Sequence, residues 1–191
     1  MSQSASTVSR GWEFMATYSP ALPNTGTITF DGASSYVAAS FCDEVRLIAT
    51  TGEKRQGYLH FDTSSIGTAT PTMAWLEYEV SSETNDFLNN SSLSLWQGAD
   101  AIGSLDVPPD TDWSLSAFSE IVGSMDHAVG VKYRVQVDES LISTTGFSDF
   151  AIVPENVPVS PLTQFTEVFE QTSFKLIVRH TGEAVDNVKN F

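Results

Sequence analysis

The sequence GYLHFDTSSI at residues 57–66, followed by AWLEYEV at residues 74–80, decides the fold of this chain. Leu59 and Phe61 share one face of the first segment, and Leu76 and Val80 share one face of the second, where Glu77 points the other way. Alternation with a period of two is typical of β-strands that are buried on one side. The residues between the segments are rich in Gly, Thr and Pro and predict a loop. The sequence therefore predicts two successive strands.

Similar short segments recur along the chain and are separated by turn residues. Strands are expected at residues 27–30, 36–40, 44–50, 58–63, 73–81, 93–96, 131–137, 147–153 and 174–180. The Asp31-Gly32 pair between the first two is a strong turn signal. Strands and helices do not alternate as they would around a parallel sheet, so the pattern predicts an antiparallel all-β sandwich or barrel.

Two short helical segments are expected within this β-rich pattern. A short helix is predicted from Ser114 to about Ile121, because Leu115, Phe118 and Ile121 follow helical spacing after a capping residue. A single helical turn is predicted at residues 138–142.

Beyond these patterns, the order of several motifs resembles a known family. The pattern Y-L-x-F-D-x-S-x-I at residues 58–66, a loop, and A-x-L-x-x-x-V at residues 74–80 resemble the signature of DNRLRE-type and related carbohydrate-binding-module-like proteins. YRVQVD at 133–138, DFAIV at 149–153 and FKLIVRH at 174–180 extend the similarity over residues 27–181. The resemblance implies a jelly-roll β-sandwich, a fold found in secreted surface proteins and in structural proteins of tailed bacteriophages.

The last of these motifs departs from the family pattern. Phe174 replaces the usual Pro, and His180 stands where Tyr is common. No ligand-binding residue is therefore carried over from the family.

The ends of the chain differ from this central region. Residues 1–26 are expected to form an extended N-terminal arm whose anchors Trp12, Phe14 and Tyr18 dock on neighbouring subunits, and residues 182–191 a polar tail. A first strand wrapped onto the sandwich is an equal alternative for the arm.

Composition restricts the classes of partner. The 191 residues include 24 acidic and 9 basic side chains, which gives a formal net charge of −15. Such a surface repels nucleic-acid phosphates and anionic membranes, so neither is an expected partner. No segment resembles a signal peptide or a membrane span, and synthesis in a host cytoplasm is expected. The single cysteine, Cys42, excludes an intrachain disulfide and is expected to be a small buried hydrophobic residue.

Catalytic or metal-binding chemistry is not indicated by the motifs. His60, His127 and His180 are the only histidines and lack metal-ligand spacing. A phosphate-binding loop and a nucleophile elbow are also missing, so neither an enzyme nor a cofactor is expected. Asp62 is expected to accept hydrogen bonds from the turn that follows it. A structural calcium ion bound there is the alternative.

Trp75 lies on the polar side of its strand, with Met73 and Glu77. An exposed Trp at this position would stack on a sugar or anchor a protein contact, and burial under another segment is the alternative. Together with the resemblance, these features predict a non-enzymatic, homo-oligomeric structural protein of a virus particle. It would be a tailed-phage head decoration or cement protein, or a fibre or baseplate component, that contacts capsid or tail proteins. A carbohydrate-binding or receptor-binding module is the alternative.

Overall fold

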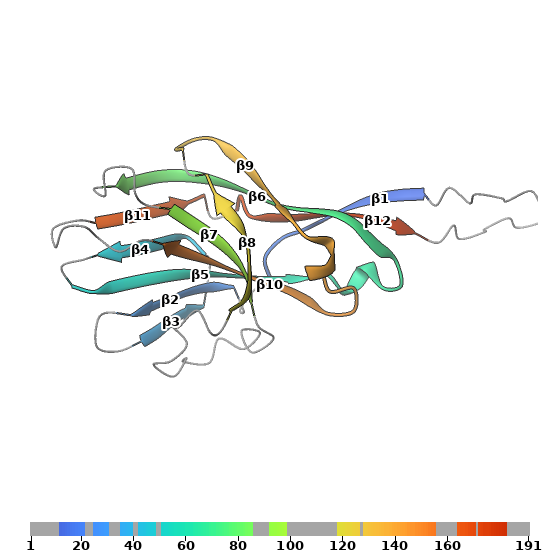
Figure 1. Cartoon of the computed structure of the whole chain (residues 1–191), viewed down its shortest axis with the longest axis horizontal. Coiled ribbons are helices and arrows are strands. Elements are labelled where there is room, and N and C mark those ends of the chain that lie inside the picture. The colour runs from blue at the N-terminus through green and yellow to red at the C-terminus, as the bar shows by residue number, and fades with distance from the viewer. Residues whose placement is uncertain are drawn as a thin grey trace, which may run out of the picture.

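The computed structural model describes residues 12–21, 25–30, 35–39, 42–48, 51–85, 92–98, 118–126, 128–155, 164–170 and 172–182. Twelve strands and two 3₁₀ turns are found in these ranges (Figure 1). They are β1 (Trp12–Tyr18), β2 (Gly26–Phe30), β3 (Ser35–Ala39), β4 (Glu44–Ile48), β5 (Glu53–Asp62), η1 (Ser64–Ile66), β6 (Thr70–Asn85), β7 (Ser92–Gly98), β8 (Phe118–Met125), β9 (Lys132–Val137), η4 (Glu139–Leu141), β10 (Phe147–Glu155), β11 (Gln164–Phe169) and β12 (Lys175–Gly182).

The strands form one antiparallel sheet with two side branches. The main path runs β1-β12-β6-β11-β4-β5-β10-β7-β8. The remaining strands extend it, because β2 pairs with β5, β3 with β2, and β9 with β6. The all-β, antiparallel prediction is confirmed, and the described ranges contain no helix that is long and apolar enough to cross a membrane.

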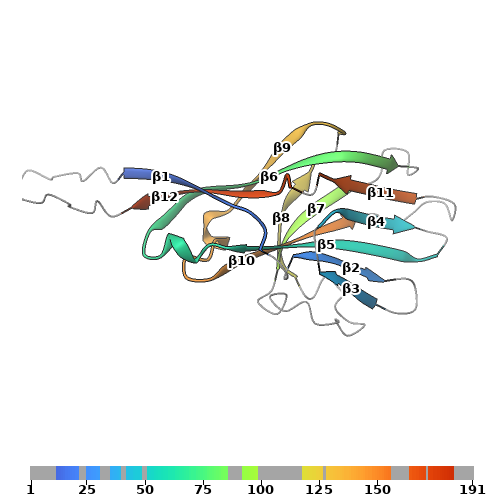
Figure 2. The same cartoon turned by 180° about the vertical axis from the view of Figure 1, so that it is seen from behind.

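The 16-residue strand β6 connects the two halves of this sheet. Its first part pairs with β12 on one side, where Glu77 lies opposite Lys175, and with β9 on the other. Its last part pairs with β11, where Val80 lies opposite Phe169. In both views β6 runs along much of the molecule, from the end that carries β1 to the end that carries the β4–β5 turn (Figures 1 and 2).

The expected strands are found with shifted boundaries. They correspond to β2 to β7, β9, β10 and β12, and the expected helical turn corresponds to η4. The prediction of a short helix was wrong for residues 118–121, which belong to β8. This strand pairs with β7 from Gly98↔Phe118 to Leu93↔Met125. Residues 114–117 of that helix lie outside the described residues. Cross-strand pairing therefore overrides the helical spacing.

The first and last described strands are neighbours in the sheet. Residues 12–18, predicted as part of an arm or as a first strand, form β1 and pair along their whole length with β12. Thr181 and Gly182 are the last residues of β12, and residues 183–191 of the expected tail lie outside the described residues. The strand alternative therefore holds for residues 12–18.

The core is built from the alternating positions that the sequence predicts. Leu59, Phe61, Leu76, Val80 and Leu176 are at most 1% exposed. Burial of one such side chain contributes about 1.5–3 kcal/mol, so these positions supply much of the free energy of folding.

An aromatic cluster joins β6, β9, β11 and the start of β12. The ring of Tyr78 packs against those of Tyr133, Phe169 and Phe174 at centroid distances of 5.7, 6.1 and 6.3 Å. The Tyr78 hydroxyl donates to the carbonyl of Asp126 at 2.6 Å, which satisfies its polar end.

Candidate functional site

The sheet formed by β1, β12, β6 and β9 has two faces, and the candidate contact residues divide between them. Register partners share a face, so Thr17, Ile177, Trp75 and Gln136 form one row across the four strands. The adjacent row contains Met15, Arg179 and Met73. We call these two rows the outer face, because the core residues Ala74, Leu76 and Val178 point to the opposite side.

Polar contacts on the outer face tie its strands together. The Arg179 guanidinium contacts Met73 Sδ at 3.5 Å and a carboxylate oxygen of Glu13 at 3.3 Å. Trp75 is half-buried. Its exposure is therefore intermediate between the two alternatives, an exposed contact residue and a residue buried under another segment. Met15 is 67% exposed, so the outer face offers an apolar contact at its β1 edge.

Two of the residues predicted as contacts on β1, Phe14 and Tyr18, lie on the face opposite Trp75. Phe14 is 49% exposed and stacks on His180 at a centroid distance of 6.0 Å. Tyr18 is half-buried against the core, and its hydroxyl lies 3.2 Å from Ser65 Oγ. The backbone of Trp12 pairs with Gly182, and its side chain lies outside the described structure. Phe14 and Trp75 are therefore not part of one patch, and exposed Met15 lies on the same face as Trp75.

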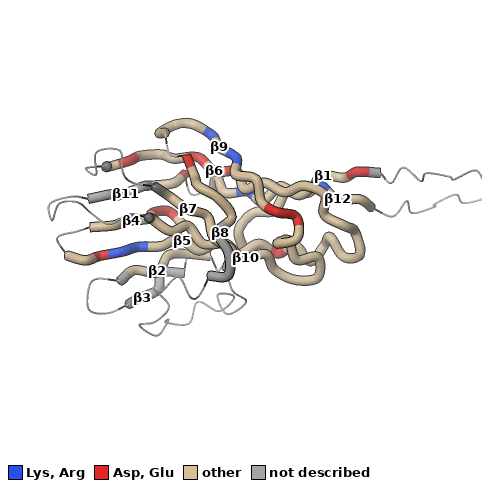
Figure 3. Tube along the Cα trace, viewed as in Figure 1, with Lys and Arg blue, Asp and Glu red and all other residues tan. Residues whose placement is uncertain are grey.

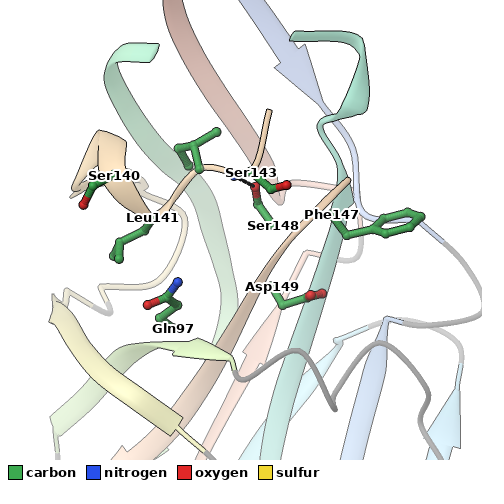
Figure 4. A pocket seen from close by; sticks show the side chains of 8 residues that line it. Gln97, Ser140, Leu141, Ser143, Phe147, Ser148 and Asp149 are labelled. Carbon is green, nitrogen blue, oxygen red and sulfur yellow. Dashed lines mark hydrogen bonds between the residues drawn. The ribbon is translucent and has the colours of Figure 1, made fainter. Parts of the chain in front are cut away.

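A small pocket lies where η4 meets the start of β10 (Figure 4). Its volume is about 230 Å³, and its lining is mostly polar. The lining residues are Gln97, Ser140, Leu141, Ile142, Ser143, Phe147, Ser148 and Asp149. In Figure 4 the Phe147 ring points away from the Ser140 and Gln97 side chains. The Asp149 carboxylate points the same way as Phe147, so the polar groups of Gln97 and of residues 140–143 characterise the hollow.

Some of these polar groups are held by the protein itself. Ser148 Oγ accepts a hydrogen bond from the amide of Ser143 at 3.0 Å and lies 2.9 Å from Thr63 Oγ1. The Thr63 hydroxyl also donates to the Ser143 carbonyl at 2.7 Å. The floor of the pocket is therefore fixed in position.

Next to the pocket, a buried histidine and an aspartate pair across β5 and β10. Asp149 lies opposite His60, and Asp149 Oδ1 is 2.5 Å from His60 Nδ1. His60 is 3% exposed, and Phe147 stacks on its ring at 4.1 Å. His60 Nε2 has no hydrogen-bond partner in the part of the chain that the structure describes. The hydrogen bond thus fixes one ring nitrogen and leaves the other as a buried polar atom.

Two turns in this region share an Asp-x-Ser motif. Asp62 Oδ1 accepts hydrogen bonds from the Ser64 hydroxyl at 2.5 Å and the Ser64 amide at 3.1 Å. Asp138 Oδ1 accepts the same two bonds from Ser140 at 2.6 and 2.8 Å. In each case the serine hydroxyl, followed by the amide, lowers the pKa of the carboxyl. The turn role predicted for Asp62 is confirmed, and the same motif identifies Asp138, which was not predicted.

Cys42 is 1% exposed, as predicted for a small buried hydrophobic residue. Burial, and secondarily the charge of Asp43, raise the pKa of its thiol. In the described ranges, His, Cys, Asp and Glu side chains do not gather in groups of three that would hold a metal ion.

Comparison with known proteins adds no assignment. No protein-family model matches the chain, and no curated protein matches its sequence.

Proposed function

We propose that this protein is a non-enzymatic structural component of a virus particle. It serves as a head decoration or cement protein of a tailed phage, or as part of its fibre or baseplate. The observation that carries the proposal is strand β1, a terminal strand at the edge of an all-β body that exposes Phe14 and Met15 to a neighbouring subunit. Its partners are capsid or tail proteins, and it is made in the host cytoplasm before assembly.

The fold that suits this role is a jelly-roll β-sandwich. Long β6 joins two groups of strands, which enclose the buried residues between them. β8, at one end of the path, approaches β9, which branches from β6, because a Cβ on Gly123 would lie 3.5 Å from Val135 Cγ1. These contacts, and the resemblance of residues 27–181 to jelly-roll proteins, support the proposal of a jelly-roll β-sandwich.

The charge distribution supports a particle role rather than nucleic-acid or membrane binding. Asp and Glu positions recur along the backbone trace in Figure 3, and the net charge is −15. Such a surface keeps a crowded assembly soluble and disfavours binding to phosphate-rich surfaces.

The decisive experiment is quantitative mass spectrometry of density-gradient-purified particles from a lysate of the source culture. A fixed stoichiometry to a capsid or tail protein is expected. A chain found wholly in the soluble fraction would overturn the proposal.

The pocket favours a second candidate, a carbohydrate-binding or receptor-binding module. The amide of Gln97 and the hydroxyls of Ser140 and Ser143 are groups that recognise sugar hydroxyls in concave sites. Trp75 supplies a separate surface that would stack on a sugar ring. In this second candidate function, this chain would also bind a structural calcium ion with Asp62 as a ligand.

Affinity electrophoresis in polysaccharide gels distinguishes the two sugar-binding surfaces. Retention that is lost in Gln97→Ala places the glycan in the pocket, and retention that is lost in Trp75→Ala places it on the outer face. Ser124→Ala, an exposed change on β8, is the matched control. Unretarded migration of the native protein in every gel, with a melting temperature that is unchanged by chelator, would remove this candidate.

A further inference from the structure

β1 is an edge strand with one described neighbour. It pairs with β12 over seven residues, from Trp12↔Gly182 to Tyr18↔Leu176, without a shift of register. Among the described strands none pairs with its other edge, and the backbone N–H and C=O groups of that edge are the ones that another strand would use. Edge strands that avoid such pairing usually carry charged side chains, Lys above all, or Pro or a bulge. The β1 sequence WEFMATY has no Lys or Pro, its one charged residue, Glu13, is paired with Arg179, and its pairing with β12 is regular.

The charge around β1 differs from that of the whole chain. Strands β1 and β12 together contain one acidic residue, Glu13, and two basic residues, Lys175 and Arg179, so their formal charge is +1. Glu13 is also paired with Arg179 at 3.3 Å. A chain of net charge −15 can therefore bring this edge towards another copy with less like-charge repulsion than its average surface would impose.

We propose that the β1 edge binds the β1 edge of a second copy of this chain. The two strands run antiparallel about a two-fold axis that passes through Met15. An isologous contact of this kind needs a self-complementary strand. With Met15 opposite Met15, the side chain of Phe14 lies beside the small Ala16 of the second copy, and Glu13 lies beside Thr17.

This register also separates the acidic residues. The two copies of Glu13 are four strand positions apart, roughly 14 Å at the usual rise of a β-strand. That exceeds the Debye length of ~8 Å at physiological salt. The two Met15 side chains, 67% exposed in the single chain, cover each other on the outer face. The sheet then continues as β9-β6-β12-β1 and, across the axis, β1-β12-β6-β9.

The pairing goes beyond the proposed function, because purified protein would form the dimer whether or not the chain belongs to a particle. Failure to find the chain in particles would therefore leave the dimer in place. Loss of the dimer would equally leave the mass-spectrometric result unchanged.

Sedimentation velocity on the full chain tests the proposal through charges placed at the axis. The native protein is expected to show a concentration-dependent dimer. Met15→Lys and Met15→Glu should each be monomeric, since each places two like charges directly opposite. An equimolar mixture of the two variants should restore the dimer. Val129→Lys, at an exposed residue in the turn before β9, is the matched control and should dimerise like the native protein.

A monomeric native protein, or a dimer that is unaffected by the Met15 variants, would overturn the proposal. Thermal unfolding of each variant confirms that it is folded, as expected for a residue that is 67% exposed. Cross-linking gives a second measurement, because Met15→Cys should form a disulfide-linked dimer under mild oxidation. Val129→Cys should form far less, and the native Cys42 is buried. Equal cross-linking of the two variants would also contradict the proposed register.

Discussion

His60 on β5 and Asp149 on β10 are buried cross-strand partners, and one hydrogen bond of 2.5 Å joins Nδ1 of the imidazole to Oδ1 of the carboxylate. The other ring nitrogen has no described partner. Asp149→Ala is expected to destabilise the protein by about 1–3 kcal/mol, the usual cost of a buried polar group without its partner. Chemical denaturation measures this change.

A second substitution separates that cost from lost packing. His60→Phe keeps a ring against Phe147 and removes the nitrogen that needs Asp149. Asp149→Ala should therefore cost less in a His60→Phe background than in the native protein. Equal costs in both backgrounds would show that the hydrogen bond does not determine the effect.

Gly57 and Cys42 are predicted to be energetically coupled. A Cβ on Gly57 would collide with Cys42 Sγ, and Cys42 is 1% exposed and has little room to move. Gly57→Ala is expected to destabilise the fold by about 1–3 kcal/mol through overpacking. The double variant Gly57→Ala/Cys42→Ala should recover part of that loss in denaturant unfolding. A double variant no more stable than Gly57→Ala would contradict the collision.

The Asp-x-Ser turns predict a loss of stability in acid. The pKa of Asp62 and that of Asp138 are lowered in the folded protein by hydrogen bonds from Ser64 and Ser140. A lowered pKa means that folding favours the charged form. The contribution is thus fully present above the unfolded pKa of ~3.9 and is lost as pH falls through the folded pKa.

Thermal unfolding across this pH range checks the sign. Native protein should lose more stability on acidification than the double variant Asp62→Asn/Asp138→Asn, which cannot titrate at these positions. Asp126→Asn, an exposed change outside these turns, is the control and should behave like the native protein. If the stability of the double variant and that of the native protein fell in parallel with pH, these two turns would not be the source of the acid-induced loss.

Cys42 should be unreactive in the native state. Burial and the neighbouring Asp43 raise the pKa of its thiol, so little of the nucleophilic thiolate forms near neutral pH. A thiol reagent is expected to label it slowly in buffer and rapidly in denaturant. Rapid labelling under native conditions would mean that the β4–β5 region opens readily.

Strands whose burial follows local alternation were predictable from the sequence. β6 over residues 73–80 and β9 over residues 132–137 each bury alternate residues more deeply, and that pattern appears in any short window of the sequence. β8 was missed because its apolar residues also fit a helical spacing, and its pairing partner β7 lies about 25 residues away. β11 was not assigned as a strand, although it pairs in a regular ladder with β4 and, with one shift of register between Val168 and Phe169, with β6.

The same distinction between local and distant contacts holds for the candidate site. The turn role of Asp62 was predictable because its partner is two residues away. The His60–Asp149 pair joins residues 89 positions apart, and neither residue type signals the other in the sequence. The pocket likewise combines Gln97 with residues 140–149 and depends on how β7, η4 and β10 are arranged.

The register of β1 and β12 also determines how this fold would respond to mechanical force. Trp12 lies opposite Gly182, so the outer ends of the first and last strands are neighbours. Tension applied between Trp12 and Gly182 would load the β1–β12 hydrogen bonds one at a time, starting from this pair, and would peel the strands apart. Strands loaded in shear share the force among all their bonds and yield later. Under tension between Trp12 and Gly182, β1 and β12 would therefore separate one hydrogen bond at a time. A load applied between other strands would be resisted by many hydrogen bonds of the sheet together.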